Sequence, residues 1–112
     1  MLSSTDLNFK SHSDFVSSLV SLFPDFAAEV ELDDPQSHHD VLLSFSFVSA
    51  RLLAGSGQKT IERFCDLVNR MVAAGGQFEN AISTCLLEHA SQCGIRRLIQ
   101  PYLSKAAKAE LR

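Results

Sequence analysis

Apolar side chains recur at intervals of three and four residues along most of this chain, which is the spacing of one face of an α-helix. The first such run consists of Phe15, Leu19, Leu22 and Phe23. We expect its helix to begin near Ser11 or Ser13, because a serine side chain can accept a hydrogen bond from the first turn. Pro24 has no amide hydrogen to donate, so the helix should break there and a short second helix should cover 25–31.

Two longer helices are predicted in the middle of the chain, over 37–54 and 58–74. The first carries a central apolar stripe, widened on both sides, that consists of Val41, Leu42, Leu43, Phe45, Phe47, Val48, Leu52 and Leu53. An apolar arc this broad is typical of the central helix of a core. The second has a narrower stripe, with Phe64 and Val68 at its centre, opposite a charged face. Glycines follow both helices and predict where they end.

Three shorter helices complete the prediction, over 78–91, 95–102 and 105–111, with His89 among the inward positions of the first. No strand pattern competes with these helices. The fold class is therefore all-α, a single-domain compact bundle over 11–112 in which five to six of these segments are antiparallel helices. An alternative is that the two hairpins, 37–74 and 78–111, stack like solenoid units. Residues 1–10 are polar and without periodicity, so we expect a flexible N-terminal segment there.

Charge is divided unequally between the two halves of the chain. Residues 1–50 hold eight acidic side chains and one basic, whereas residues 51–112 hold five acidic and nine basic. The acidic half would repel nucleic acid, and it suits either a basic protein partner or a solvated surface. For a partner, the candidate binding residues are Asp25, Glu29, Glu31, Asp33, Asp34, His38, His39 and Asp40.

Residue types with potential chemistry are present but form no catalytic or metal-binding motif. His38 and His39 are adjacent, so on a helix their side chains point about 100° apart and cannot easily share a metal ion. Glu88 and His89 are a candidate acid–base pair, although such a His more often lies at the edge of a core. No CxxC pair occurs among Cys65, Cys85 and Cys93. We therefore expect no enzyme activity, no cofactor, no metal ion and no small-molecule substrate.

The expected cellular location is inferred from segments that the sequence lacks. No apolar run reaches the roughly 18 residues that a membrane-spanning helix needs, so no membrane association is expected. The opening ten residues lack the basic start and apolar stretch of a secretory signal. Three free thiols fit a reducing compartment, and we expect the protein to be cytoplasmic.

A series of short motifs gives this chain a resemblance to a known group. In order they are Leu22-Phe23-Pro24-Asp25-Phe26, the start of the helix at 38–43, Phe64-Cys65-Asp66-Leu67-Val68 before Gly75-Gly76, Asn80-Ala81-Ile82, Cys85-Leu86-Leu87-Glu88, and Ile99-x-Pro101-Tyr102-Leu103. Over about residues 19–103 the chain resembles small all-helical immunity proteins of bacterial polymorphic toxin systems (Rhs, type VI or contact-dependent secretion). Those proteins carry an "LFPEF" start and a more aromatic "vxFLE" helix where this chain has Cys85-Leu86-Leu87-Glu88.

The resemblance implies a function by binding alone. Such proteins have no catalytic residues and neutralise one cognate toxin each. On this hypothesis the chain is an antitoxin that occludes the active or substrate-binding surface of a toxin domain with a basic surface. The alternatives are a helical adaptor that binds another protein, and a small enzyme that uses Glu88 and His89. A toxin gene beside this one would favour the first, and convergence of the two side chains in a pocket would favour the last.

Overall fold

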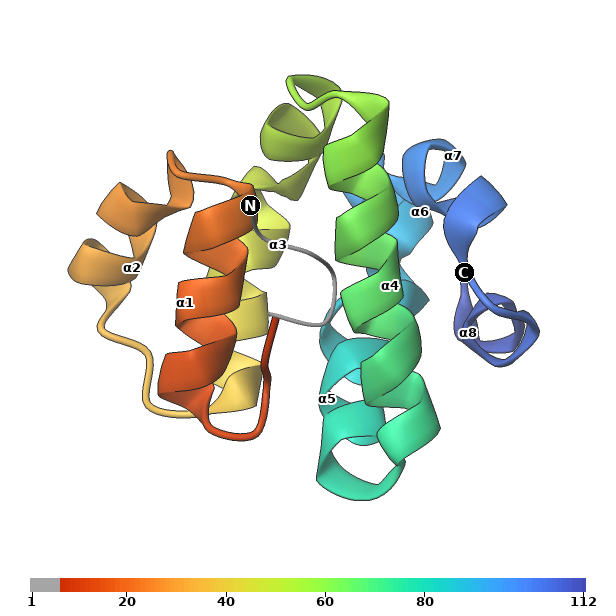
Figure 1. Ribbon diagram of the computed structural model, residues 1–112, viewed down its shortest axis with the longest axis horizontal. Coiled ribbons are helices and arrows are strands. Elements are labelled where there is room, and N and C mark those ends of the chain that lie inside the picture. The colour runs from red at the N-terminus through yellow and green to blue at the C-terminus, as the bar shows by residue number, and fades with distance from the viewer. Residues whose placement is uncertain (1–6) are drawn as a thin grey trace.

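Pro24 and the glycines divide the chain into helices in the computed structural model (Figure 1). The structure describes residues 7–112, apart from the side chain of Asp33. The α-helices are α1 (His12–Leu22), α2 (Phe26–Asp33), α3 (His38–Ala54), α4 (Gln58–Ala74), α5 (Gly76–Cys85), α6 (Ala90–Cys93), α7 (Arg96–Ile99) and α8 (Lys105–Glu110). Two 3₁₀ turns, Leu87–His89 and Gln100–Tyr102, lie among the last of these. Every regular element in 7–112 is helical, which confirms the all-α class.

Serine side chains start three of the helices where the sequence indicates. The Oγ atoms of Ser11, Ser37 and Ser104 accept hydrogen bonds from the amides of Asp14, Asp40 and Ala107, at 3.0, 3.1 and 3.2 Å. Each bond satisfies an amide that has no partner within its own helix. A cap acts within one turn, so the sequence indicates it closely, and the structure selects Ser11 over the alternative Ser13.

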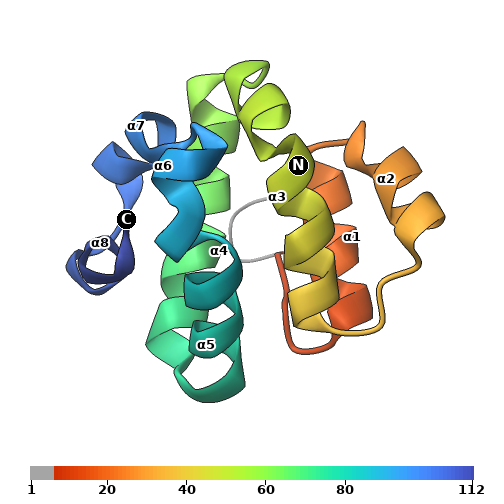
Figure 2. The same cartoon turned by 180° about the vertical axis from the view of Figure 1, so that it is seen from behind.

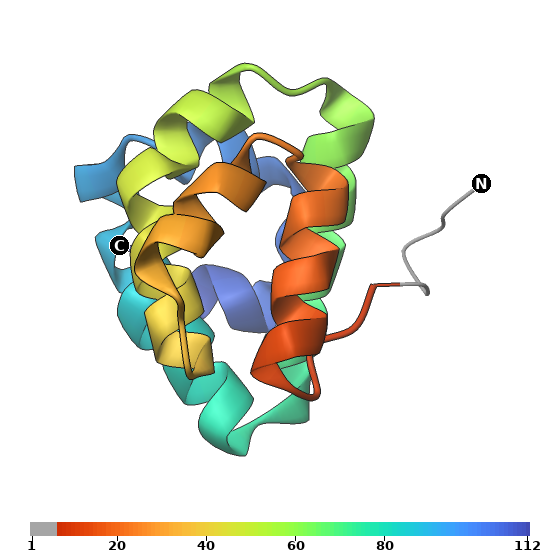
Figure 3. The same cartoon turned by 90° about the vertical axis from the view of Figure 1, so that its left-hand side faces the viewer.

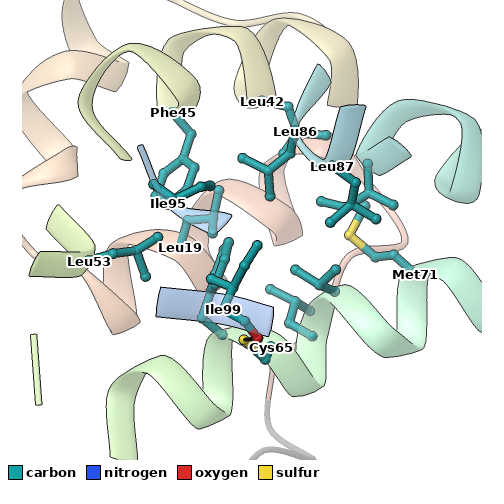
Figure 4. Close-up of a cluster of buried hydrophobic side chains, with 14 of the residues drawn as sticks. Leu19, Leu42, Phe45, Leu53, Cys65, Met71, Leu86, Leu87, Ile95 and Ile99 are labelled. Atoms are coloured by element: carbon teal, nitrogen blue, oxygen red, sulfur yellow. Dashed lines mark hydrogen bonds between the residues drawn. The ribbon is translucent and has the colours of Figure 1, made fainter. Parts of the chain in front are cut away.

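One continuous core joins the two halves of the molecule. Helices α1, α2 and α3 form one side and α4 to α8 the other, as two opposite views show (Figures 1 and 2). Phe45 of α3 lies between them, with its ring centroid 5.4 Å from Phe23, 5.4 Å from Phe26 and 5.3 Å from Phe64. Leu86, Leu87, Ile95 and Ile99 bring the C-terminal segments into the same cluster (Figure 4). A shared core of this kind differs from a solenoid, in which each unit packs only on its neighbours.

The molecule has the size expected of a single folded domain of this length. Its accessible surface is 6060 Å², against about 6,100 Å² expected from its mass. Its radius of gyration is 12.4 Å and its extents are 32 × 31 × 30 Å. None of the helices within 7–112 is both long and apolar enough to cross a membrane.

Residues 7–10 pack against the helices, although the sequence analysis places them in a flexible segment. The amide of Asn8 donates to Ser18 Oγ, whose hydroxyl donates back to the Asn8 carbonyl, both at 2.7 Å. Arg70 donates to the carbonyl of Leu7 at 2.9 Å, and Leu7 is buried. The packed part of the chain therefore includes residues 7–10 as well as the predicted domain that starts at position 11. Residues 1–6 of the expected flexible segment lie outside the described residues.

The predicted helix over 78–91 is wrong at both ends. It begins earlier, at Gly76, because Gly75 adopts φ 69° and ψ −166°, a conformation open only to glycine, and turns the chain directly from α4 into α5. It also ends earlier, at Cys85. Beyond that point the Leu87 carbonyl accepts the Arg112 amide and the Ser91 amide donates to the Arg112 carbonyl, both at 2.9 Å. The C-terminus thus occupies backbone groups that a continuous helix would use.

Candidate partner-binding site

Helix α2 and its neighbours carry most of the acidic residues predicted to bind a partner. Figure 3 shows α2 beside α1 on the outside of the molecule. Asp25 and Glu29 lie one turn apart and line a hollow whose apolar floor includes Leu22 and Leu52. Arg51 of α3 lines the same hollow and approaches Glu29, with Nη2 and Oε1 3.6 Å apart. Because the Arg51 side chain is 67% exposed, this ion pair contributes little to stability.

The remaining acids of this segment are spread around the end of α2. Glu31 is exposed and lies about 200° around the helix from Glu29, so the two do not share a face. Asp34 is exposed and ends α2 with a left-handed backbone, φ 43°. The side chain of Asp33 lies outside the described part of the structure. Within that part, Asp25, Glu31 and Asp34 form no ion pair.

Asp40 is the last of the predicted acidic residues and lies at the first turn of α3. We call the five described acids, Asp25, Glu29, Glu31, Asp34 and Asp40, the acidic surface. Its carboxylate accepts the amide of Gln36 at 3.1 Å, and its own amide donates to Ser37. The carboxylate also lies near the N-terminus of a helix, where its charge is favourable. Asp40 therefore has a structural role in addition to any contact with a partner.

The two histidines of the predicted site face different neighbours. The ring of His38 stacks on Phe15 at 5.6 Å between centroids and meets the edge of Phe78 at 5.2 Å. Its Nε2–H donates to the carbonyl of Phe9 at 2.6 Å. His38 thus ties the N-terminal segment to α3. His39 is exposed instead.

His39 approaches a cysteine that sequence reasoning did not pair with it. Its Nδ1 lies 3.3 Å from the Sγ of Cys85, 46 positions away on α5. Burial, and then the nearby Asp40 carboxylate, raises the pKa of the Cys85 thiol above its ordinary value. An attacking cysteine needs the opposite shift, which would favour the thiolate. The pair is therefore a contact between α3 and α5 in which the direction of the pKa shift disfavours the thiolate.

The other residues with potential chemistry, Cys65 and His89, lie in different environments and contact different neighbours. Cys65 is fully buried, its thiol donates to the Ile99 carbonyl, and burial followed by the Glu62 carboxylate raises its pKa to about 12. His89, which the sequence places inward, is exposed, and its Nδ1 is 2.9 Å from Gln92 Oε1. Its helix breaks before that position, which turns the side chain outward. Among the described residues no group of three or more side chains could hold a metal ion.

Two apolar residues of α3 face solvent although the sequence analysis places them in the core. Leu43 is 55% exposed and Phe47 is 81% exposed. Together with Asp40 and Ser44 they line a hollow on the outer side of the helix. The sequence contained the signal: at 100° a residue, Leu43 and Phe47 lie about 200° and 240° around the helix from Val41, far from the buried stripe. The prediction of one broad apolar arc on this helix did not distinguish Leu43 and Phe47 from the buried stripe.

A basic hollow lies elsewhere, around the turn between α6 and α7. It is lined by Ser91, Gly94, Arg96, Arg97 and Gln100, and both arginines are exposed. The acidic surface and this basic hollow therefore belong to different parts of the fold.

Comparison with known proteins finds no matching family model, no matching curated protein and no matching solved structure.

Proposed function

We propose that this chain is an immunity protein that binds a cognate bacterial toxin domain and occludes its active or substrate-binding surface. It would act in the cytoplasm, without catalysis, on a toxin whose contact surface is basic. In the same proposal, five to six of the α-helices within 7–112 pack as antiparallel neighbours and form the scaffold. The motif resemblance suggests the class of function, and the acidic surface suggests how the partner is recognised.

The observation that carries the proposal is a set of carboxylates left without ionic partners. Asp25, Glu31 and Asp34 are exposed and make no ion pair within 7–112. They lie on a helix, at its start and at its end, which is a rigid base for binding residues. Unpaired charge of one sign raises the rate at which an oppositely charged partner is captured.

The distribution of reactive groups supports binding over catalysis. Glu88 and His89 are both exposed, and His89 Nδ1 lies 2.9 Å from Gln92 Oε1. The raised pKa values of Cys65 and Cys85 keep both thiols protonated near neutral pH. An adaptor that binds a different protein through the same surface is the remaining alternative, and its partner would not be a toxin.

The first experiment asks whether the partner is a toxin. The chain is coexpressed with the product of the neighbouring gene, inactivated if it is toxic, and purified through a tag on one of the two. We expect a stoichiometric complex, and we expect cells that express this chain to survive the active product. A neighbouring product that neither binds nor kills would contradict the immunity function and leave the adaptor.

The second experiment asks whether the acidic surface makes the contact. Glu31→Lys with Asp34→Lys is compared with Glu62→Lys with Glu88→Lys, because all four residues are exposed and both pairs change the net charge equally. We expect the first pair to slow association about tenfold at low salt and less at high salt, because salt screens exposed charges. The control pair should remain within about twofold of the unaltered chain. Equal rates for both pairs would place the interface elsewhere.

A further inference from the structure

Leu43 and Phe47 form an apolar pair on the outer face of the central helix. They lie one turn apart on α3, whose outer side faces the viewer between α2 and α5 in Figure 2. Leu42, Phe45 and Leu53 of the same helix are, in contrast, fully buried. The pair is adjacent to a hollow that Asp40 and Ser44 also line. A phenylalanine that is 81% exposed beside a depression is the arrangement of a binding anchor, and aromatic anchors dominate interface energies.

The acidic residues in this part of the chain indicate which kind of binding partner fits Leu43 and Phe47. Residues 25–51 carry six carboxylates and one cation, Arg51, which already pairs with Glu29. A second copy of the chain on a two-fold axis would bring the same acidic patch against itself. Nucleic acid would be repelled by it. A basic protein surface that presents an apolar side chain fits both the hollow and the Asp40 carboxylate that lines it.

We infer that Leu43 and Phe47 are the apolar centre of a docking surface for a basic protein segment. One apolar side chain of that segment enters the hollow beside Phe47, and its lysines or arginines face Asp40 and the acids of α2. This deepens the proposed function and rests on it, since the same surface would receive the toxin. It also adds an apolar anchor to a site that the sequence describes by charge alone.

A synthetic amphipathic helix of leucine and lysine tests this chemistry without a toxin. The purified full chain, labelled with ¹⁵N, is titrated with that peptide and, separately, with a leucine–glutamate peptide and a lysine–glutamine peptide of the same length. We expect saturable binding of the leucine–lysine peptide, with the largest amide shifts around Leu43 and Phe47. The leucine–glutamate peptide should not bind. The lysine–glutamine peptide should bind at least about tenfold more weakly, because it lacks an anchor.

Matched variants test the residues themselves. Leu43→Ser with Phe47→Ser should weaken binding of the leucine–lysine peptide about 30-fold, the effect of losing an anchor. Leu32→Ser is the control, because Leu32 is 82% exposed, lies on the acidic helix α2 and does not line the hollow. It should change the affinity less than about twofold. Circular dichroism and the melting temperature should show that all of these exposed variants remain folded.

Several results would overturn the inference. The inference fails if the double serine variant keeps full affinity, or if Leu32→Ser weakens binding as much as the double variant does. Amide shifts centred on Arg96 and Arg97, or equal binding of the leucine–glutamate peptide, would also contradict it. Sedimentation that shows a dimer lost on Phe47→Ser would assign the face to a second copy. Peptide binding with no toxin partner would instead contradict only the immunity function, so the two failures are distinguishable.

Discussion

Replacing Phe45 by alanine should remove the centre of the core. Phe45 is fully buried and its ring contacts those of Phe23, Phe26 and Phe64. Phe→Ala substitutions in closed cores cost about 3–5 kcal/mol. Each aromatic pair adds roughly 0.5–1.5 kcal/mol beyond burial, so three such pairs favour the upper end of that range. We expect the free energy of unfolding to fall by about 5 kcal/mol.

The same helix offers a control of the same residue type. Phe47 is two positions away and 81% exposed, so Phe47→Ala leaves no cavity and should change stability by less than about 0.5 kcal/mol. The expected loss for Phe45→Ala corresponds to a fall of about 20 °C in melting temperature for a chain of this length. Urea unfolding followed by far-ultraviolet circular dichroism measures both variants, and equal m-values show that the unfolded states are comparable.

The comparison has a clear failing outcome. A loss below about 2 kcal/mol for Phe45→Ala would mean that the core collapses around the missing ring and that the aromatic contacts are not its centre. A loss for Phe47→Ala as large as that for Phe45→Ala would mean that Phe47 is buried in solution. That second result would also remove the apolar anchor from the proposed docking surface.

Three further predictions concern a cap, a polar link and a thiol. Ser37→Ala should lower the free energy of unfolding by about 1 kcal/mol, because the Asp40 amide loses its acceptor, whereas Ser37→Asp should retain most of it; urea titration measures both. Asn69→Ala should cost about 2–3 kcal/mol in the same assay, because Asn69 accepts the Ser104 amide and donates to the Tyr102 carbonyl, and Asn69→Asp should keep only the first bond. The Cys65 thiol has its pKa raised by burial from 9.0 to about 12, so the folded state keeps a proton that the unfolded state loses above pH 9.0. Stability from this group is therefore complete below pH 9.0 and declines by up to about 1.4 kcal/mol per pH unit between 9.0 and 12; a Cys65→Ala variant that declines equally between pH 9 and 10 would contradict this.

Most of the helices, and the serine-capped starts of α1, α3 and α8, follow from the sequence because the forces that set them act within a few residues. Ser11, Ser37 and Ser104 cap helices through bonds that span three positions. Pro24 interrupts the chain by lacking an amide hydrogen. The acidic surface follows as well, since charges on one short helix and its flanks cannot lie far apart. The exposure of Leu43 and Phe47 on α3 could also have been predicted, from their angular positions around the helix.

Contacts between distant positions were decided only by the tertiary structure. Nothing local indicates that the helix ends at Cys85, because the bonds that replace it come from Arg112, at the far end of the chain. His38 and His39 are indistinguishable by residue type, yet one meets Phe9 and the other Cys85. The carbonyl of Leu7 accepts a hydrogen bond from Arg70, 63 positions away. Sequence patterns report spacing along one helix, whereas these partners are chosen by how separate helices pack, and that choice is made only when the core closes.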